Sequence, residues 1–228
     1  MNRTLNVVRM QLVNRMTYLW IPLIILFGSF ALSLVVFALI PSTGIKISGG
    51  ASAPFWYFAV VGAQALTLTF PFSQALSITR REYYLGTLLT AALTSAGLTA
   101  IFVVGAAIES ATGGWGRNGY FFTLQWIWAA GPAMAALFYF SSAMLFFVVG
   151  FTGATIYKRF GMLWLTVTII AAVALLVGVF WIVGRLDAWV AFFSWFVDIG
   201  AGGITLLLAG LVVVLAAAAF PVLRRATP

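Results

Sequence analysis

The sequence predicts an all-α membrane protein with six transmembrane helices and both termini in the cytoplasm. Of its 228 residues, 64% are hydrophobic and only 7% are charged, whereas soluble domains are about 45–50% apolar and about 25% charged. The charges lie at the borders of apolar runs that reach the roughly 20 residues of a membrane span. The basic residues are also sorted by side, because nine of the twelve lie in alternate gaps between these runs.

The sorting of the basic residues predicts the orientation. One side holds Arg3, Arg9, Arg15, Arg80, Arg81, Lys158, Arg159, Arg224 and Arg225, and the other holds Lys46, Arg117 and Arg185. Short loops rich in Lys and Arg remain in the cytoplasm, so we expect the first group to lie inside. The net charge of +8 is spread over short segments, which favours contact with anionic lipid over nucleic-acid binding.

The chain begins with a basic, partly apolar segment. Leu5, Val8, Leu12 and Met16 recur at helical spacing, which predicts an interfacial helix over residues 1–17 on the inner surface. The apolar run that follows is longer than the 7–15 residues of the apolar core of a signal peptide. We therefore expect it to remain as the first span.

The six spans are predicted at residues 18–40, 55–78, 85–108, 132–156, 161–184 and 204–223. Pro71 has no backbone N–H to donate and is expected to kink the second span. Pro132 divides the uncharged run 120–156, so that its first part lies along the outer interface. Residues 188–203 are too short and too aromatic for a crossing, which predicts an outer interfacial or re-entrant helix.

Several kinds of chemistry are excluded by composition. The chain has no Cys and no His, so it has no thiolate ligand and no Ser-His-Asp triad. Its four acids, Glu82, Glu109, Asp187 and Asp198, lie at predicted span ends or in loops. The sequence also lacks the Gly-x-x-x-x-Gly-Lys of a phosphate-binding loop. We expect no catalytic or metal site here, and any ATP and Mg²⁺ must be bound by another chain.

The second span carries uncharged polar residues. Gln64, Ser73, Gln74 and Ser77 lie near or beyond the Pro71 kink. They are predicted either to hydrogen-bond between helices or to line a substrate path, and the sequence leaves both interpretations open.

Residues 77–95 read SITRREYYLGTLLTAALTS. This segment resembles the first cytoplasmic loop of ABC-2 type permeases, in which charged residues precede Gly-Thr-Leu and an apolar span follows. Arg80, Arg81 and Glu82 supply the charges, and Gly86 opens the Gly-Thr-Leu. The chain departs from the family pattern in the three residues between Glu82 and Gly86, and in Leu89, where the family often has Glu.

The layout of the whole chain is similar to that family, and the resemblance implies a mechanism. Two permease subunits, identical or homologous, would form the export pathway in a bacterial cytoplasmic membrane, and separate ATP-binding subunits would drive them. The loops 79–86 and 157–161 would couple the two kinds of subunit. The residues implied in this contact are Arg80, Arg81, Glu82, Tyr83, Gly86, Lys158 and Arg159.

Two other functions remain open at this point. The chain could be a self-sufficient carrier or channel, since ion sites can be built from backbone carbonyls and hydroxyls without a buried acid. It could also be a membrane assembly factor that transports nothing. The apolar interior favours a drug, lipid or peptide as cargo, but the sequence does not identify one.

Overall fold

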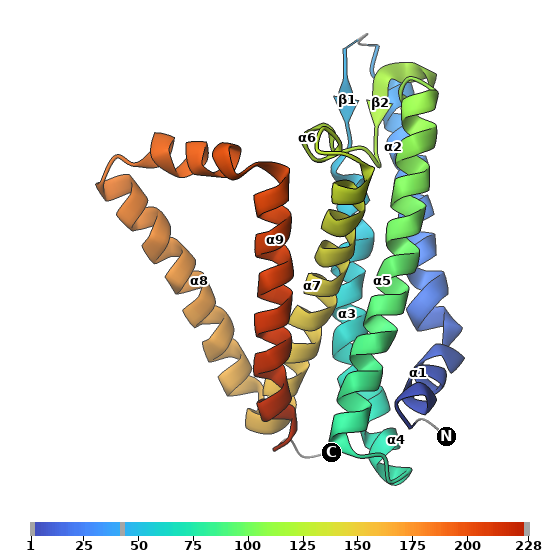
Figure 1. Cartoon of the computed structure of the whole chain (residues 1–228), viewed down its shortest axis with the longest axis vertical. Helices are drawn as coiled ribbons and strands as arrows, with labels where there is room; N and C mark the ends of the chain where they lie inside the picture. The colour runs from blue at the N-terminus through green and yellow to red at the C-terminus, as the bar shows by residue number, and fades with distance from the viewer. Residues whose placement is uncertain (1–2, 42–43, 226–228) are drawn as a thin grey trace.

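The computed structural model describes residues 3–41 and 44–225, and nearly all of its ordered structure is helical (Figure 1). Six helical stretches are long and apolar enough to cross a membrane, as predicted. They are Met16–Leu39, Gly49–Ala75, Arg80–Ala111, Pro132–Phe160, Met162–Arg185 and Trp189–Leu223. These stretches indicate a multi-pass membrane protein.

The first two stretches contain wide π-helical turns. Helix α1 (Arg3–Val13) leads into η1 (Met16–Trp20) and α2 (Ile21–Leu39). The second stretch runs through η2 (Gly49–Ser52), α3 (Ala53–Gln64), η3 (Ala65–Thr69) and α4 (Phe70–Ala75). The predicted irregularity at Pro71 is present as the π-helical turn η3, which directly precedes Phe70 and Pro71.

The later elements are longer. Helices α5 (Arg80–Ala111), α7 (Pro132–Phe160) and α8 (Met162–Arg185) follow one another, with η4 (Gly114–Asn118) and α6 (Gln125–Trp128) between the first two. Strands β1 (Lys46–Ile47) and β2 (Gly119–Tyr120) pair in parallel at the end of the molecule opposite α1 (Figure 1). Pro132 opens α7, so the predicted division of the uncharged run at this residue is confirmed.

The chain closes with α9 (Trp189–Leu223), in which two helices meet at a kink. The predicted separation of residues 188–203 from the last span is present, but the break in helical backbone lies at Gly200, a few residues before the predicted boundary. There the chain turns, and the segment before Gly200 runs across the axis of the part that follows (Figure 1).

The core lies between α3, α5 and α7. Gly62 on α3 and Gly150 on α7 let the two backbones touch: a Cβ at Gly62 would lie 2.0 Å from the Phe147 carbonyl oxygen, and one at Gly150 would lie 1.8 Å from that of Ala59. Such contacts between small residues replace the hydrophobic driving force that is missing between helices in lipid. Buried rings, among them Phe70, Phe102, Phe147 and Phe151, fill the remaining space.

Two loops predicted on the basic side are in fact helix ends. Residues 79–84 form the start of α5, because the Thr79 side chain accepts from the Glu82 N–H and the Glu82 carboxylate accepts from the Thr79 N–H. This reciprocal arrangement is a capping box, which begins a helix by satisfying its first donors. Residues 157–160 form the last turn of α7. The positive charges of Lys158 and Arg159 interact favourably there with the negative end of the helix dipole.

Candidate functional site

One end of the molecule, which we call the cation-rich end, collects α1, the start of α5, the turn between α7 and α8, and the last turn of α9 (Figure 1). Nine of the twelve basic side chains belong to these segments and to the start of η1, with Glu82 as their one acid. The opposite end has three basic and three acidic residues. The whole net charge of +8 therefore lies at one end.

The segments of the cation-rich end are joined to each other. The Arg80 guanidinium donates to the backbone carbonyl oxygen of Arg224, and the Tyr84 hydroxyl donates to that of Ala216. Both bonds connect the first turns of α5 to the end of α9. Arg81 lies between Arg80 and Tyr84 in the chain, and its side chain is exposed to the surroundings.

A cavity of about 410 Å³ opens between the ends of α7 and α9. Arg159, Pro221, Arg224 and Arg225 line it. The Arg159 guanidinium also stacks over the Phe160 ring, 4.4 Å from its centroid. Three guanidinium groups around one cavity favour an anionic neighbour, since each presents several N–H donors and a fixed positive charge.

Glu82 is used within the chain. Its Oε2 accepts from the Thr79 N–H at 3.0 Å and from the Thr79 hydroxyl at 2.7 Å, while its Oε1 lies 4.0 Å from the Arg3 Nε. The acid that the resemblance assigns to an ATPase contact therefore has a structural role in starting α5.

Tyr83 and Gly86, two more residues of the implied contact, lie inside. Tyr83 is fully buried, and its hydroxyl donates to the Ala65 carbonyl oxygen. A Cβ at Gly86 would lie 2.5 Å from the Val7 Cβ. Tyr83 therefore connects α5 to η3, and Gly86 connects α5 to α1. Among the first residues of α5 in the implied contact, Arg81 has the exposed side chain.

A buried polar cluster that the sequence analysis missed surrounds Tyr83. The Gln11 amide donates to the Thr87 hydroxyl at 2.9 Å and to the Thr69 hydroxyl at 3.3 Å, and Thr69 is 3.0 Å from the Tyr83 hydroxyl. The cluster lies where α1, η3 and α5 meet. The apolar spacing predicted a different buried face for this helix. Leu5 and Met16 of the predicted stripe are exposed. The side chains that are buried are Val7, Val8 and Gln11, so spacing alone did not identify the glutamine.

The four residues of the possible substrate path do not share one environment. Ser73 is buried and donates to the Phe70 carbonyl oxygen, and Gln74 donates to that of Ile78. Gln64 is half-buried, and Ser77 is exposed with left-handed backbone after the end of α4. The hydrogen bonds of Ser73 and Gln74 stay within their own segment.

Glu109 organises the opposite end of the molecule. Its fully buried carboxylate accepts from the Trp115 Nε1–H at 2.8 Å and from the backbone N–H groups of Phe121 (2.6 Å), Phe122 (3.1 Å) and Thr123 (2.7 Å). One carboxylate thus satisfies the donors of a loop that has no helix or sheet to satisfy them. Nothing in the local sequence pattern identifies this role.

The described part of the chain contains no group of three or more His, Cys, Asp and Glu residues that could hold a metal ion. Glu82 lies at the cation-rich end, and the three acids of the opposite end do not form such a group. Comparison of the chain with protein-family profiles, with curated proteins and with solved structures finds no match. The fold and the charge distribution define the class of the protein, a multi-pass helical membrane protein.

Proposed function

We propose that this chain is the membrane permease subunit of an ATP-driven exporter in a bacterial cytoplasmic membrane, where it works with separate ATP-binding subunits. The observation that carries the proposal is the position of the whole net charge of +8 at one end, on joined segments. Under the positive-inside rule this end faces the cytoplasm, where ATP is available.

The cation-rich end is suited to receive force from a partner. The capping box fixes the start of α5, and the Arg80 and Tyr84 bonds tie that start to α9. A displacement of residues 79–86 would therefore move α5 together with the end of α9. Rigid-body movement of this kind is how ligand-driven closure of one subunit is passed to another.

The proposal places ATP on another chain. The sequence has no Gly-x-x-x-x-Gly-Lys segment, and the residues that the structure describes hold no group of three or more acids. In the proposed complex ATP and Mg²⁺ are bound by the partner subunit, and an acidic surface on that subunit complements Arg81, Lys158 and Arg159. Electrostatic complementarity of this kind sets the orientation and the rate of docking.

The pathway requires a second copy or a homologue of the chain. Large aromatic side chains close the core between α3, α5 and α7. By contrast, α8 has no buried residue over its 24 residues and diverges from the rest of the molecule (Figure 1). A path between two subunits does not need an opening in the filled core. If α8 and α9 lie near the contact between the subunits, the second subunit also covers the exposed side chains of α8.

Co-purification from bacterial membranes that express the tagged full-length chain tests the proposal. We expect a protein with a phosphate-binding loop to accompany the chain, and Arg81→Glu to reduce its recovery at least fivefold. Arg117→Glu is the matched control, since Arg117 is also exposed but belongs to η4, which directly precedes β2 at the opposite end of the molecule. Equal losses with both variants would contradict docking at the cation-rich end.

Reconstitution separates the proposed function from the two other functions left open by the sequence. Gradient-driven flux through liposomes that contain this chain alone would establish a carrier or channel. Absence of nucleotide-driven flux with every co-purified subunit present would favour an assembly factor. Flux that needs both the chain and its ATPase partner is the result we expect.

A further inference from the structure

The cavity of about 410 Å³ between the ends of α7 and α9, which we call the arginine cavity, is lined by Arg159, Pro221, Arg224 and Arg225. Its volume lies in the range of about 300–1,000 Å³ that is typical of small-molecule sites. The positive-inside rule explains why these arginines lie at the cation-rich end. It does not explain why two different helices bring them to one cavity.

The three arginines lack a partner of opposite charge within the part of the chain that the structure describes. Glu82 is the one acid of the cation-rich end, and its carboxylate lies 4.0 Å from the Arg3 side chain. No ion pair or hydrogen bond joins the side chains of Arg159, Arg224 and Arg225 to another described residue. Like charges repel each other, so an anion bound among them would stabilise the arrangement.

Aromatic rings contact two of the guanidinium groups and leave their donors available. The Arg159 Cζ lies 4.4 Å from the centroid of the Phe160 ring, and the Arg224 Cζ lies 5.9 Å from that of Phe220. A cation–π contact attracts the charge without using an N–H group. Arginine can then bind a phosphate through two parallel hydrogen bonds.

Exposed aromatic side chains indicate that the arginine cavity lies at the level of the lipid headgroups. Phe160 and Trp164 are 46% and 54% exposed, and their ring centroids lie 6.4 Å apart. They lie where the candidate span of α7 ends and that of α8 begins. Tryptophan is enriched at the interface between membrane and water. Basic pockets between transmembrane helices at this level bind the headgroups of anionic lipids.

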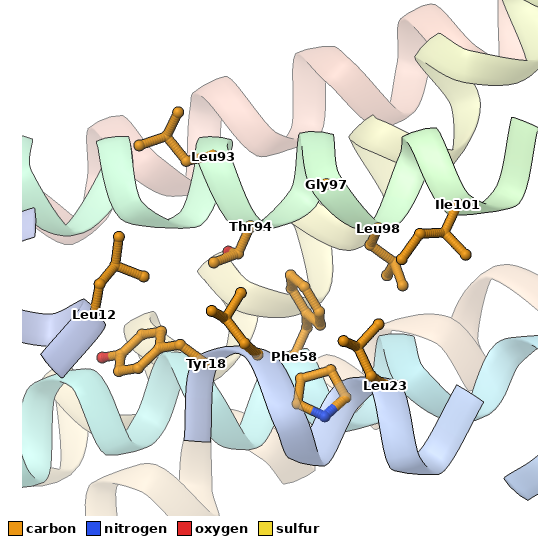
Figure 2. Close-up of a pocket in the computed structure, with 11 residues that line it drawn as sticks. Leu12, Tyr18, Leu23, Phe58, Leu93, Thr94, Gly97, Leu98 and Ile101 are labelled. Carbon is orange, nitrogen blue, oxygen red and sulfur yellow. The ribbon is translucent and has the colours of Figure 1, made fainter. Parts of the chain in front are cut away.

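The arginine cavity differs in its chemistry from a pocket of about 230 Å³ between α2, α3 and α5 (Figure 2). Leu23, Phe58 and Leu98 belong to the lining of that pocket, and none of the described residues that line it is charged. Its surface favours no particular ligand. The three guanidinium groups of the arginine cavity, by contrast, favour an anion with several acceptor oxygens.

We propose that the arginine cavity binds the phosphate group of an anionic phospholipid in the adjacent leaflet, with Arg159, Arg224 and Arg225 as hydrogen-bond donors. Free phosphate has the same chemistry, but the exposed rings beside the cavity favour the lipid. Binding needs no ATPase, although Arg159 also belongs to the proposed docking surface. Failure of lipid binding would therefore leave the proposed export function intact.

Titration of the purified full-length chain with lipid tests the proposal. The chain in uncharged detergent receives short-chain phosphatidylglycerol, and native mass spectrometry measures the bound lipid. No second protein is present, so the carboxylates of a partner cannot occupy the cavity. Phosphatidylcholine is the matched lipid, because its phosphate is accompanied by a positive choline group. We expect phosphatidylglycerol to bind at least about tenfold more tightly. Equal binding of the two lipids would overturn the proposal.

Inorganic phosphate distinguishes the two sources of the anion. At the same concentration it should displace little of the bound phosphatidylglycerol, because it gains nothing from the apolar surroundings of the headgroup. Complete displacement would overturn the lipid as the source and would assign the cavity to free phosphate.

Arg159→Gln combined with Arg225→Gln tests the location of the site. We expect the affinity for phosphatidylglycerol to fall at least about tenfold, as for the loss of a hydrogen bond to a charged group. Arg9→Gln combined with Arg15→Gln is the matched control. Both of these residues are exposed at the cation-rich end and do not line the cavity, so the same loss of charge should change the affinity little. Equal losses in the two double variants would show that the charge of the whole end attracts the lipid, and would overturn a local site.

Arg159→Lys combined with Arg225→Lys keeps every charge, and therefore keeps the orientation of the chain in the membrane. Lysine lacks the forked pair of donors that arginine offers to phosphate. We expect the affinity for phosphatidylglycerol to fall by about threefold or more while the melting temperature stays unchanged. Unchanged affinity in this variant would overturn a site formed by guanidinium donors.

Discussion

Gly86 on α5 lies against Val7 on α1, so close that a Cβ at Gly86 would approach the Val7 Cβ to 2.5 Å. The Thr4 carbonyl oxygen would be only 2.9 Å from the same position. The glycine of the Gly-Thr-Leu segment therefore provides the surface on which the first helix packs. This relationship gives the motif a role that does not depend on any partner.

Gly86→Val should displace α1 from α5. Both contacts belong to a neighbouring helix, one of them to its backbone, so the added methyl groups cannot be accommodated locally. We expect a loss of about 1–3 kcal/mol in the free energy of unfolding, as for other overpacked sites. Trypsin should also cleave faster at Arg9, because α1 is no longer held. Gly28→Val, at an open position, is the control, and equal behaviour of the two variants would contradict the packing role.

Glu82→Gln separates the structural use of this residue from a direct contact with a partner. Glutamine also serves at the third position of a capping box, so the start of α5 should persist. We expect the melting temperature and the stimulation of the co-purified ATPase to stay unchanged. Thr79→Ala removes the cap, should cost about 0.5–2 kcal/mol, and should reduce the stimulation.

The contrary outcome for Glu82 is specific. If Glu82→Gln abolished ATPase stimulation at an unchanged melting temperature, the negative charge itself would be required. The carboxylate would then act on the partner, and the ion pair with Arg3 and the bonds to Thr79 would be secondary.

Glu109→Ala should release the loop at the opposite end of the molecule. The substitution leaves the N–H groups of Phe121, Phe122 and Thr123 without their acceptor, and each buried donor left unpaired costs about 1–3 kcal/mol. We expect a lower melting temperature and faster tryptic cleavage after Arg117. Ser110→Ala, at the exposed neighbouring position, should change neither. Resistance of Arg117 to trypsin in the Glu109 variant would refute this role.

The sequence predicted the six spans because hydropathy is a local property of each stretch. The entry of α7 at Pro132 and the disturbance near Pro71 were predictable for the same reason, since proline acts on its own helix. The start of α5 was misplaced: the charges at residues 80–82 suggested a loop, whereas Thr79 and Glu82 cap a helix there. Charge indicates proximity to water but does not exclude a helix.

The site was predictable in part. The gathering of the basic residues at one end followed from the alternation of spans, and the structure brings them together as expected. The burial of Gln11 and Tyr83 depends on how α1 packs against α5, which no single segment encodes. Glu109 was read only as a residue at the end of a span, since its four donors come from residues 6 to 14 positions later in the chain.

Gly210→Trp should disrupt the proposed contact between two copies of the chain. Gly210 is exposed in an apolar groove of about 600 Å³ along α9, and a Cβ there would meet no atom within 4 Å, so the large side chain leaves the fold of one subunit intact. If a second copy covers this groove, the indole occupies its place and the apparent dissociation constant should rise at least tenfold. Subunit association can be measured by fluorescence energy transfer between labelled chains in liposomes of increasing dilution. Gly28→Trp, equally open but on α2, should leave association unchanged, and association that survives Gly210→Trp would show that α9 does not form the contact.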